Sequence, residues 1–235
     1  MTAIADICVM HLLLTAATTA EIQPSLDWLT VQRKSGTFQK ADILITGVGA
    51  VATSYCLANF LGTTKPGIVV QAGIAGSFQD DREGDTVAIR RDCFADLGAW
   101  ENEQFRDIFD LGLIEKNQPP FANRFLLNPY EKLLSIAGLE QVNSITVNEI
   151  TTVSRRIAWY KQNLSPVVES MEGAAFHYVC LLEKIPFLQI RSISNLIGER
   201  DKTKWHMAKA INNLNETIIS LLNKLCQYDE AYSWI

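Results

Sequence analysis

An acid and an amide, Glu172 and Asn195, stand at the ends of two predicted strands. Glu172 comes shortly after the apolar pair Val167-Val168, and Asn195 follows the apolar run PFLQIRSIS. The C-terminal ends of parallel strands meet at the edge of a sheet where ligands bind, so both side chains would face one crevice. A carboxylate at a helix N-terminus is stabilised in its ionised form and can accept hydrogen bonds from two vicinal hydroxyls. Taken alone, Glu172 fits two interpretations equally, a ligand-binding acid or an acid that only complements the helix dipole.

A second acid, Glu21, lies near the start of the helix after the first predicted strand, where Thr18 or Thr19 can cap that helix. A carboxylate in this place can accept a proton from water. From the residues alone, a solvated first-turn acid is the favoured interpretation. Glu169 is a rival carboxylate on the strand-to-helix turn, and we rank it below the other two.

The segment from Val167 to Asn195 must position Glu172 and Asn195. It reads as a short strand, a sharp turn into a helix, and a second strand. Ser170 is predicted to cap the helix, which places Glu172 in its first turn. Apolar residues at helical spacing then form a buried stripe: Met171, Ala175, Tyr178, Val179 and Leu182.

The rest of the chain alternates short apolar strands with helices, the pattern of a doubly wound α/β fold. We predict strands at residues 7–15, 41–46, 67–71, 84–90 and 141–147, and helices through Leu29, through Leu61, and at 129–138, 151–163 and 203–228. The run AGIAGSF after the third strand is predicted to be a tight loop, and residues 91–124 a loop-rich excursion. No repeat or linker divides the chain, so we expect one domain over residues 1–235.

Composition narrows the classes of partner. The 235 residues are 48% hydrophobic and 20% charged, with a net charge of −5 and no Lys/Arg-rich stripe, which argues against nucleic acid. The five cysteines are scattered without metal-like spacing, and several read as buried thiols of a reducing compartment. The apolar run Ile7 to Leu14 is too short to span a membrane and reads as a strand. We therefore expect a cytoplasmic protein with no metal or organic cofactor. His11 and His177 lie in buried-looking elements and are expected to be core residues.

SMEGAA, followed by a strand and RSISN, resembles the purine nucleosidase and phosphorylase superfamily. Within it the chain looks most like the futalosine hydrolases, close to the methylthioadenosine/S-adenosylhomocysteine nucleosidases, over nearly its whole length. The resemblance implies an α/β fold with three layers and a mixed, mostly parallel central sheet, as in the nucleoside phosphorylases. It also implies a homodimer or higher homo-oligomer.

The resemblance assigns roles to particular residues. Glu172 and Met171 would grip the ribose, and Glu21, at the end of TAATTAE, would activate water. The AGIAGSF run would face the ribose, the segment TVNEI would form a wall of the base pocket, and one aromatic residue would lie over the 5′ substituent. The implied binding residues are Met171, Glu172, Gly73, Ala75, Asn148, Ile150 and Trp205, and the implied catalytic residues are Glu21, Glu172 and Asn195. Arg200, Lys202 and Lys204 are possible cations for a 5′ carboxylate.

The residues that would bind phosphate in related enzymes are missing here, and this indicates which nucleophile the chain uses. The related phosphorylases place a phosphate-binding arginine just before the glycine-containing loop, and here that position is Gln71. Their Gly- and Arg-bearing loop after the first strand corresponds here to AATTAE. We therefore expect nothing basic to hold a phosphate dianion, and hydrolysis is favoured over phosphorolysis.

Asn195 indicates the leaving base, because adenine-specific nucleosidases carry Asp there. Hypoxanthine offers two acceptors, N7 and O6, and an Asn amide supplies two N–H donors. The expected reaction is hydrolysis of the N-glycosidic bond of futalosine to hypoxanthine and dehypoxanthine futalosine, in menaquinone biosynthesis. The alternatives are an adenine-releasing nucleosidase acting on methylthioadenosine, S-adenosylhomocysteine or aminofutalosine, and a non-catalytic nucleoside-binding protein.

Overall fold

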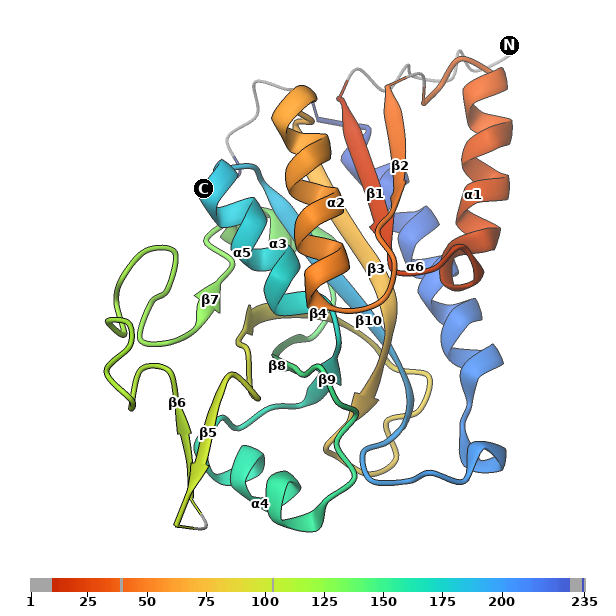
Figure 1. The fold of residues 1–235 in the computed structure, drawn as a ribbon. Coiled ribbons are helices and arrows are strands. Elements are labelled where there is room, and N and C mark those ends of the chain that lie inside the picture. Colours follow the sequence, from red (N-terminus) through yellow and green to blue (C-terminus); the bar gives the residue numbers. More distant parts are fainter. Residues whose placement is uncertain (1–9, 39, 103, 229–233, 235) are drawn as a thin grey trace.

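The computed structural model describes residues 10–38, 40–102, 104–228 and 234. Its larger sheet has eight strands, in the order β10-β4-β8-β9-β3-β1-β2, with β7 paired to β4, and helices cover both of its faces (Figure 1). The strands are β1 (Leu12–Ala16), β2 (Ala41–Ile45), β3 (Ile68–Ser77), β4 (Thr86–Asp92), β7 (Leu126–Leu127), β8 (Gln141–Thr146), β9 (Val168–Ser170) and β10 (Phe187–Leu196). The helices are α1 (Thr19–Lys34), α2 (Ala50–Thr63), α3 (Glu131–Ala137), α4 (Ser154–Asn163), α5 (Gly173–Glu183) and α6 (Met207–Leu225), with a short 3-10 helix at Lys202–Lys204.

The sheet is mixed, which confirms the predicted fold class. Five of its pairings between described strands are parallel and three are antiparallel. β3 pairs with β1 through its first half, with β9 through its last two residues, and with β10 along most of its length. Because β10 also pairs with β4, the strands β3, β10, β4, β8 and β9 close into a ring around a small apolar cluster: Ala75, Val87, Ile89, Val142, Val168 and Ile193.

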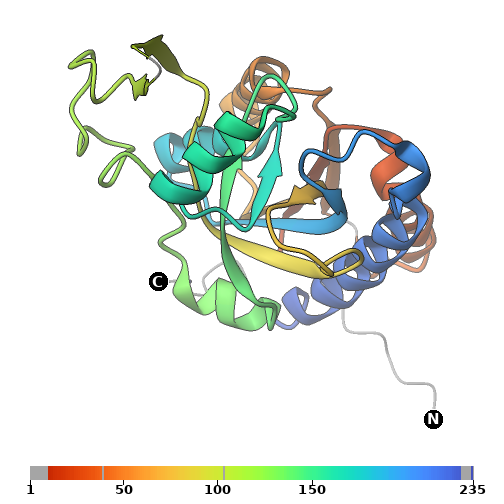
Figure 2. The ribbon, with the colours of Figure 1, turned by 90° about the horizontal axis from the view of Figure 1, so that it is seen from below.

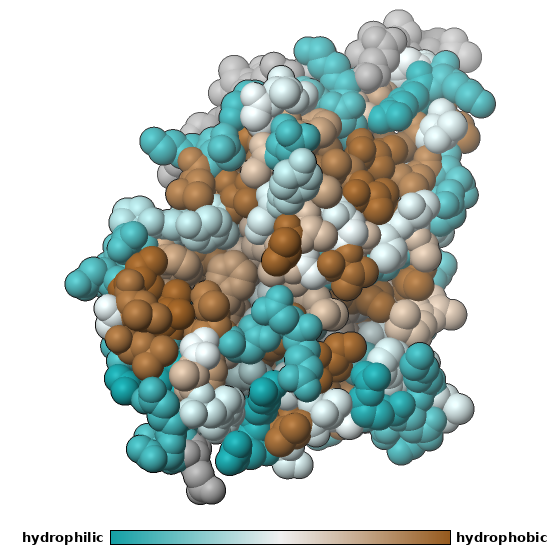
Figure 3. Space-filling model, viewed as in Figure 1, coloured by the Kyte–Doolittle hydropathy of each residue, from teal (hydrophilic) through white to brown (hydrophobic). Residues whose placement is uncertain are grey.

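The helices complete three layers. α2 packs against α5 on one face of the sheet, and α1 packs against α6 on the other. α6 buries Leu214, Ile218 and Leu222 from a regular apolar stripe, as its sequence predicts. The face that carries α2 and β2 exposes apolar side chains (Figure 3), among them Ile45, Val48 and Val51. None of the helices in the described ranges is long and apolar enough to cross a membrane.

Several sequence predictions need correction. The run AGIAGSF is no loop, because β3 continues through Ser77. β9 and β10 were expected to be parallel, but β9 pairs with β3 antiparallel while β10 pairs with β3 parallel, so the two run in opposite directions. The helix begins at Gly173, so Glu172 is its N-cap residue and Ser170 still belongs to a strand. The excursion after β4 contains a hairpin, β5 (Gly98–Glu101) and β6 (Gln104–Asp107), that stands away from the sheet (Figure 2).

The first strand begins later than predicted. The expected strand at 7–15 corresponds to β1 from Leu12, and its residues 7–9, with Cys8, lie outside the described residues. Cys56, Cys93 and Cys180 are free thiols, and Cys93 and Cys180 are buried. Cys226 is disulfide-bonded, which the sequence analysis did not expect.

Candidate active site

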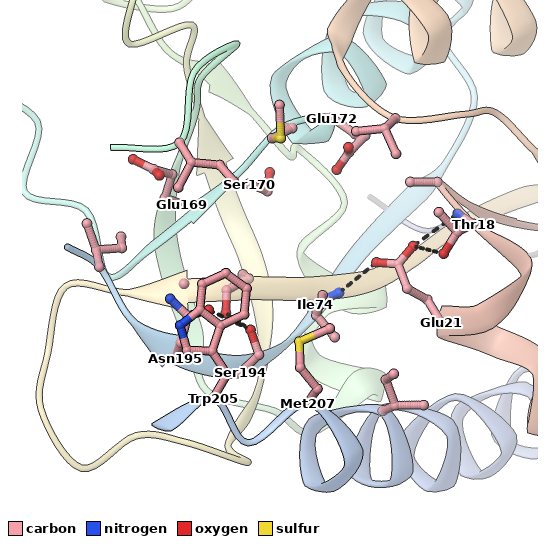
Figure 4. A pocket seen from close by; sticks show the side chains of 18 of the residues that line it. Thr18, Glu21, Ile74, Glu169, Ser170, Glu172, Ser194, Asn195, Trp205 and Met207 are labelled. Atoms are coloured by element: carbon pink, nitrogen blue, oxygen red, sulfur yellow. Dashed lines mark hydrogen bonds between the residues drawn. The ribbon is translucent and has the colours of Figure 1, made fainter. Parts of the chain in front are cut away.

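A cavity of about 350 Å³ opens where the C-terminal parts of β3, β9 and β10 approach the N-terminal ends of α1 and α6 (Figure 4). This volume is within the range of small-molecule sites. Apolar side chains form most of the wall, and a few polar groups converge on it. The lining includes Glu21, Ile74, Ala75, Gly76, Ile150, Glu169, Ser170, Met171, Glu172, Ser194, Asn195, Trp205 and Met207.

Glu21 is held at one end of the cavity by three donors. Its Oε2 accepts from the backbone N–H of Thr18 at 3.0 Å and from the Thr18 hydroxyl at 2.9 Å. Its Oε1 accepts from the backbone N–H of Ile74 at 3.1 Å, as Figure 4 shows. Thr18 is the N-cap of α1 and Glu21 its third residue, so this is the geometry of a capping box. The carboxylate therefore caps its own helix and also faces the cavity.

Glu172 lies across from Glu21 and is 6% exposed. Its Oε1 accepts from the backbone N–H of Gly49 at 3.0 Å, and its Oε2 lies 3.5 Å from Nη1 of Arg191. Gly49 precedes α2 with a φ of +94°, a conformation that side chains rarely adopt, which lets its N–H point at the carboxylate. Two carboxylates, Glu21 and Glu172, thus border the same part of the cavity.

Arg191 is the residue that the sequence analysis missed. Its side chain is 1% exposed, and Nη2 donates to Oε1 of Gln71 at 2.9 Å. A Cβ at Gly73 would lie 2.2 Å from Nη1 of Arg191 and 3.1 Å from Oε1 of Glu21. Gly73 is therefore needed for close approach, since the arginine crosses β3 where a side chain would otherwise stand. An Arg and a Gln alternating in an otherwise apolar strand, QIR, was the signal in the sequence.

Arg191 lies close to Glu172, although the sequence predicts that nothing basic is left to hold a phosphate dianion. Its charge, however, is already engaged by Glu172 and Gln71, and Arg191 does not itself line the cavity. A phosphate dianion would also meet the carboxylates of Glu21 and Glu172. This pair of acids is therefore consistent with the predicted preference for water over phosphate.

Asn195 lies at the other end of the cavity, beside Gly76 of β3. Its Oδ1 accepts from the Ser194 hydroxyl at 2.8 Å, and its Nδ2 donates to the carbonyl of Leu196 at 3.0 Å. The amide orientation is thus determined by its neighbours, and one N–H remains for a ligand. The sequence alone predicts two such donors, and the structure leaves one because the other N–H is bonded to Leu196.

Glu169 pairs with Gly76 on the side of β3 opposite Asn195. Its Oε1 accepts from the backbone N–H of Thr151 at 3.0 Å, while its Oε2 is buried without a hydrogen-bond partner. Burial raises the pKa of Glu169. The residue that the sequence analysis ranked last among the acids therefore lines the cavity and helps to hold the segment that carries Ile150.

The remaining predicted residues are placed as follows. Ala75, Met171, Ile150 and Trp205 line the cavity, whereas Gly73 and Asn148 do not. Asn148 is exposed and is hydrogen-bonded to Asp96 through its backbone N–H and its Nδ2. The indole Nε1 of Trp205 donates to the carbonyl of Glu199 at 3.2 Å, and the Arg200 guanidinium lies 5.4 Å from the Trp205 ring centroid.

The predicted cation Lys204 pairs with Glu199 at 2.7 Å. His177 is fully buried, and burial lowers its pKa to about 3, so it is a neutral core residue. His11 pairs with Asp42 at 2.7 Å. Within the described ranges, no three His, Cys, Asp or Glu side chains are grouped so as to hold a metal ion.

Residues 16–223 match the phosphorylase superfamily. A futalosine hydrolase of Thermus thermophilus is 28% identical over 182 residues, which cover 76% of this chain and 80% of that protein. A 5′-methylthioadenosine/S-adenosylhomocysteine nucleosidase of Haemophilus ducreyi is 24% identical, with coverages of 77% and 79%. Among solved structures, the corresponding nucleosidase of Colwellia psychrerythraea, in complex with adenine, superposes with a TM-score of 0.73 at 21% identity, covering 92% of this chain and 96% of that one.

Proposed function

The chain belongs to the phosphorylase superfamily, and from this premise we propose that it hydrolyses the N-glycosidic bond of futalosine and releases hypoxanthine. Three observations support the proposal: the similarity to futalosine hydrolases over three quarters of the chain, two carboxylates at one end of a nucleoside-sized cavity, and an amide at the other. The pair of carboxylates, Glu21 and Glu172, is the main observation behind this proposal.

Glycosidic cleavage develops positive charge on the ribosyl ring, through an oxocarbenium-like transition state. Glu172 is positioned to accept hydrogen bonds from ribose hydroxyls, and its negative charge stabilises that cation. Met171, next to it in the lining, packs against the sugar. Because Gly49 and Arg191 already hold the carboxylate in place, little reorganisation is needed at the moment of cleavage.

Glu21 activates the attacking water. Its oxygens already accept hydrogen bonds from the Thr18 N–H and hydroxyl and from the Ile74 N–H, and a carboxylate has about four acceptor sites. One acceptor position on Oε1 therefore remains for a water. As positive charge develops on the anomeric carbon, Glu21 takes the proton of that water as a general base.

Asn195 assists the departing base. Its remaining amide N–H donates to an acceptor on the purine, N7 or O6, and so stabilises the charge that builds on the leaving group. Ile150 and Trp205 provide apolar walls for the base and for the 5′ substituent. The product sugar carries a free anomeric hydroxyl, as expected for a step of menaquinone biosynthesis that consumes futalosine.

A second candidate is an adenine-releasing nucleosidase. The relative from Haemophilus ducreyi and the superposed Colwellia structure, both named as methylthioadenosine/S-adenosylhomocysteine nucleosidases, favour it. The Asn at position 195 favours the 6-oxopurine instead, because its Oδ1 already accepts from the Ser194 hydroxyl and the group left for a ligand is an N–H donor, which suits O6 rather than a 6-amino group.

We extend the proposal to the whole protein. One nucleosidase domain over residues 1–235 is supported by lining residues that range from Ala17 to Ile211. A homodimer or higher assembly is supported by the exposed apolar Val48 and Val51 beside the cavity. A cytoplasmic location is supported by the free thiols of Cys56, Cys93 and Cys180, while the bonded Cys226 argues against it.

Incubation of the purified protein with futalosine, aminofutalosine, methylthioadenosine and inosine, each with and without inorganic phosphate, tests this function. We expect hypoxanthine from futalosine at a rate that does not depend on phosphate, together with a reducing sugar product. Release of adenine alone would establish the second candidate. A sugar 1-phosphate product would show phosphorolysis and would contradict the role of Glu21.

A further inference from the structure

Glu172 occupies a position in which a polar side chain ordinarily caps its own helix. Short polar side chains at an N-cap accept hydrogen bonds from the N–H groups of the first turn. The Glu172 carboxylate makes no such bond, because its oxygens are directed to Gly49 and Arg191. The first N–H groups of α5 are buried and need other acceptors.

Those acceptors come from two other strands. The N–H of Gly173 donates to the Ser170 hydroxyl at 3.2 Å, and the N–H of Ala174 donates to the Thr146 hydroxyl at 2.7 Å. Thr146 is the last residue of β8 and is 1% exposed. The shorter of the two capping bonds is therefore made by a residue 28 positions away in the sequence.

Asp92 determines which way the Thr146 hydroxyl points. The hydroxyl donates to Oδ1 of Asp92 at 3.0 Å, and the carboxylate also accepts from the Cys93 N–H at 2.8 Å and from Nε2 of Gln189 at 3.3 Å. A hydroxyl has one proton and two lone pairs. Because the Thr146 hydroxyl directs its proton at Asp92, a lone pair of the hydroxyl oxygen is left to accept from the Ala174 N–H.

The glycine of SMEG allows this contact. A Cβ at Gly173 would lie 2.3 Å from Oδ2 of Asp92 and 2.1 Å from Nε2 of Gln189. The first turn of α5 thus packs directly on a fully buried carboxylate. A negative charge at this end of a helix is also favoured by the helix dipole.

We propose that Thr146, held by Asp92, replaces Glu172 as the side-chain cap of α5 and so leaves the Glu172 carboxylate free to face the cavity. Thr146 and Asp92 are positioning residues, since neither lines the cavity and both act through Glu172. The identity of the group that Glu172 binds rests on the proposed function, whereas the cap itself does not.

The test compares Thr146→Val, which keeps the shape but removes the acceptor, with Thr146→Ser, which restores the hydroxyl. We expect Thr146→Val to lower kcat/KM for futalosine by about tenfold to a hundredfold, because a misplacement of about 1 Å in a positioned group can cost about 10²-fold in rate, and Thr146→Ser to recover most of the loss. Thr15→Val is the matched control, because Thr15 is buried on β1 and its hydroxyl has no partner. This control should leave kcat/KM unchanged.

A double-mutant cycle shows whether Thr146 acts through Glu172. In a Glu172→Gln background, Thr146→Val should cost little further activity, because the group being positioned has already lost its charge. Equal losses in both backgrounds, or a lower Tm with unchanged kcat/KM, would reduce Thr146 to a stabilising residue and overturn the proposal. If Thr146→Val does not fold, Thr146→Ala takes its place in the cycle.

Amide hydrogen exchange separates this proposal from the proposed function. The Ala174 amide should exchange faster in Thr146→Val than in the native protein, while amides in the middle of α6 stay protected. This readout needs no substrate. A native protein that releases no base would refute the hydrolase, and the exchange result would still decide whether the cap exists: unchanged protection of Ala174 would overturn it.

Discussion

The two ends of the cavity differ in how completely their polar groups are bonded. At the sugar end, both oxygens of Glu21 accept hydrogen bonds, and both oxygens of Glu172 have partners, Gly49 and Arg191. At the base end, the Asn195 amide keeps one free N–H, and Oε2 of Glu169 has no hydrogen-bond partner. At the sugar end every carboxylate oxygen is thus already held by a protein group, whereas the base end keeps a free donor and an oxygen without a partner.

This difference matches the chemical task of each end. A positive charge that exists only in the transition state is best stabilised by groups that are already fixed in place. A choice between two bases depends on polar groups that the correct base satisfies and the wrong one leaves unpaired. We therefore expect changes at the sugar end to reduce the rate for every substrate, and changes at the base end to alter the ratio between substrates.

The largest effect is expected for Glu21→Gln. A capping box accepts Gln as well as Glu at this position, so the start of α1 should be preserved while the proton acceptor is lost. Loss of a general base typically lowers turnover by about 10²–10⁴-fold. Steady-state kinetics should show the loss in kcat with KM nearly unchanged, for 6-oxo and 6-amino nucleosides alike. A turnover within a few-fold of the native value would leave Glu21 as a capping residue only.

Gly73→Ala should disturb the support of the sugar end without removing any of its polar groups. The new methyl group would lie 2.2 Å from Nη1 of Arg191, so the guanidinium must shift and its contact with Glu172 is disturbed. A displacement of about 1 Å in a positioned group can cost about 10²-fold in rate. Gly62→Ala is the control, because that helical glycine has open space around it. If Gly73→Ala is as active as this control, Arg191 does not position Glu172.

Asn195→Asp should change the ratio between substrates. An aspartate there would place a carboxyl oxygen about where Nδ2 now donates to the Leu196 carbonyl. Two oxygens repel each other unless one carries a proton, so this carboxyl oxygen must be protonated and donate to the carbonyl. No donor then remains for N7 or O6, but an oxygen can accept from a 6-amino group. One unpaired buried polar group costs about 1–3 kcal/mol, or roughly tenfold to a hundredfold in the ratio. The measurement is kcat/KM for futalosine against aminofutalosine, and equal losses for both would show that residue 195 only shapes its loop.

The sequence is most informative where the chemistry is local. Alternating apolar strands and helices predicted the α/β fold, and Glu21 and Thr18, three residues apart, were recognisable as a helix start. The direction of β9 was not predictable, because three residues carry no signal of whether their partner runs parallel or antiparallel. Gly73 and Gly76 were mistaken for a loop, because the groups that fill their side-chain space, Arg191 and Ile197, lie more than a hundred positions away.

The same limit applies within the site. Arg191 was overlooked because a charged residue in a strand is buried only if partners such as Gln71 and Glu172 are brought to it by the fold. Ser170 was expected to cap α5, and it does bind the Gly173 N–H from the strand before. The shorter bond, from Ala174 to Thr146, joins two segments that local patterns cannot relate.

Asp92→Asn is expected to have the smallest effect on the chemistry and to change mainly the stability of the protein. Burial raises the pKa of Asp92 from 3.8 to about 6. Between these values the folded protein holds a proton that the unfolded chain has released, so the free energy of unfolding falls as pH rises from about 4 to about 6 and stays lower above that. A rise of the pKa from 3.8 to about 6 corresponds to about 3 kcal/mol. Asn cannot ionise, and Oε1 of Gln189, which has no partner in the native protein, can turn to accept from the new amide.

Urea unfolding measures this difference in stability. At pH 8 the Asp92→Asn variant should be about 1–3 kcal/mol more stable than the native protein, and at pH 4 the two should be equally stable. The control is Asp80→Asn, at an exposed aspartate, which should show no such difference. If the variant is instead less stable at pH 8, the charge of Asp92 at the N-terminus of α5 contributes more than its burial costs, and the order of the sugar end depends on that charge as well as on hydrogen bonds.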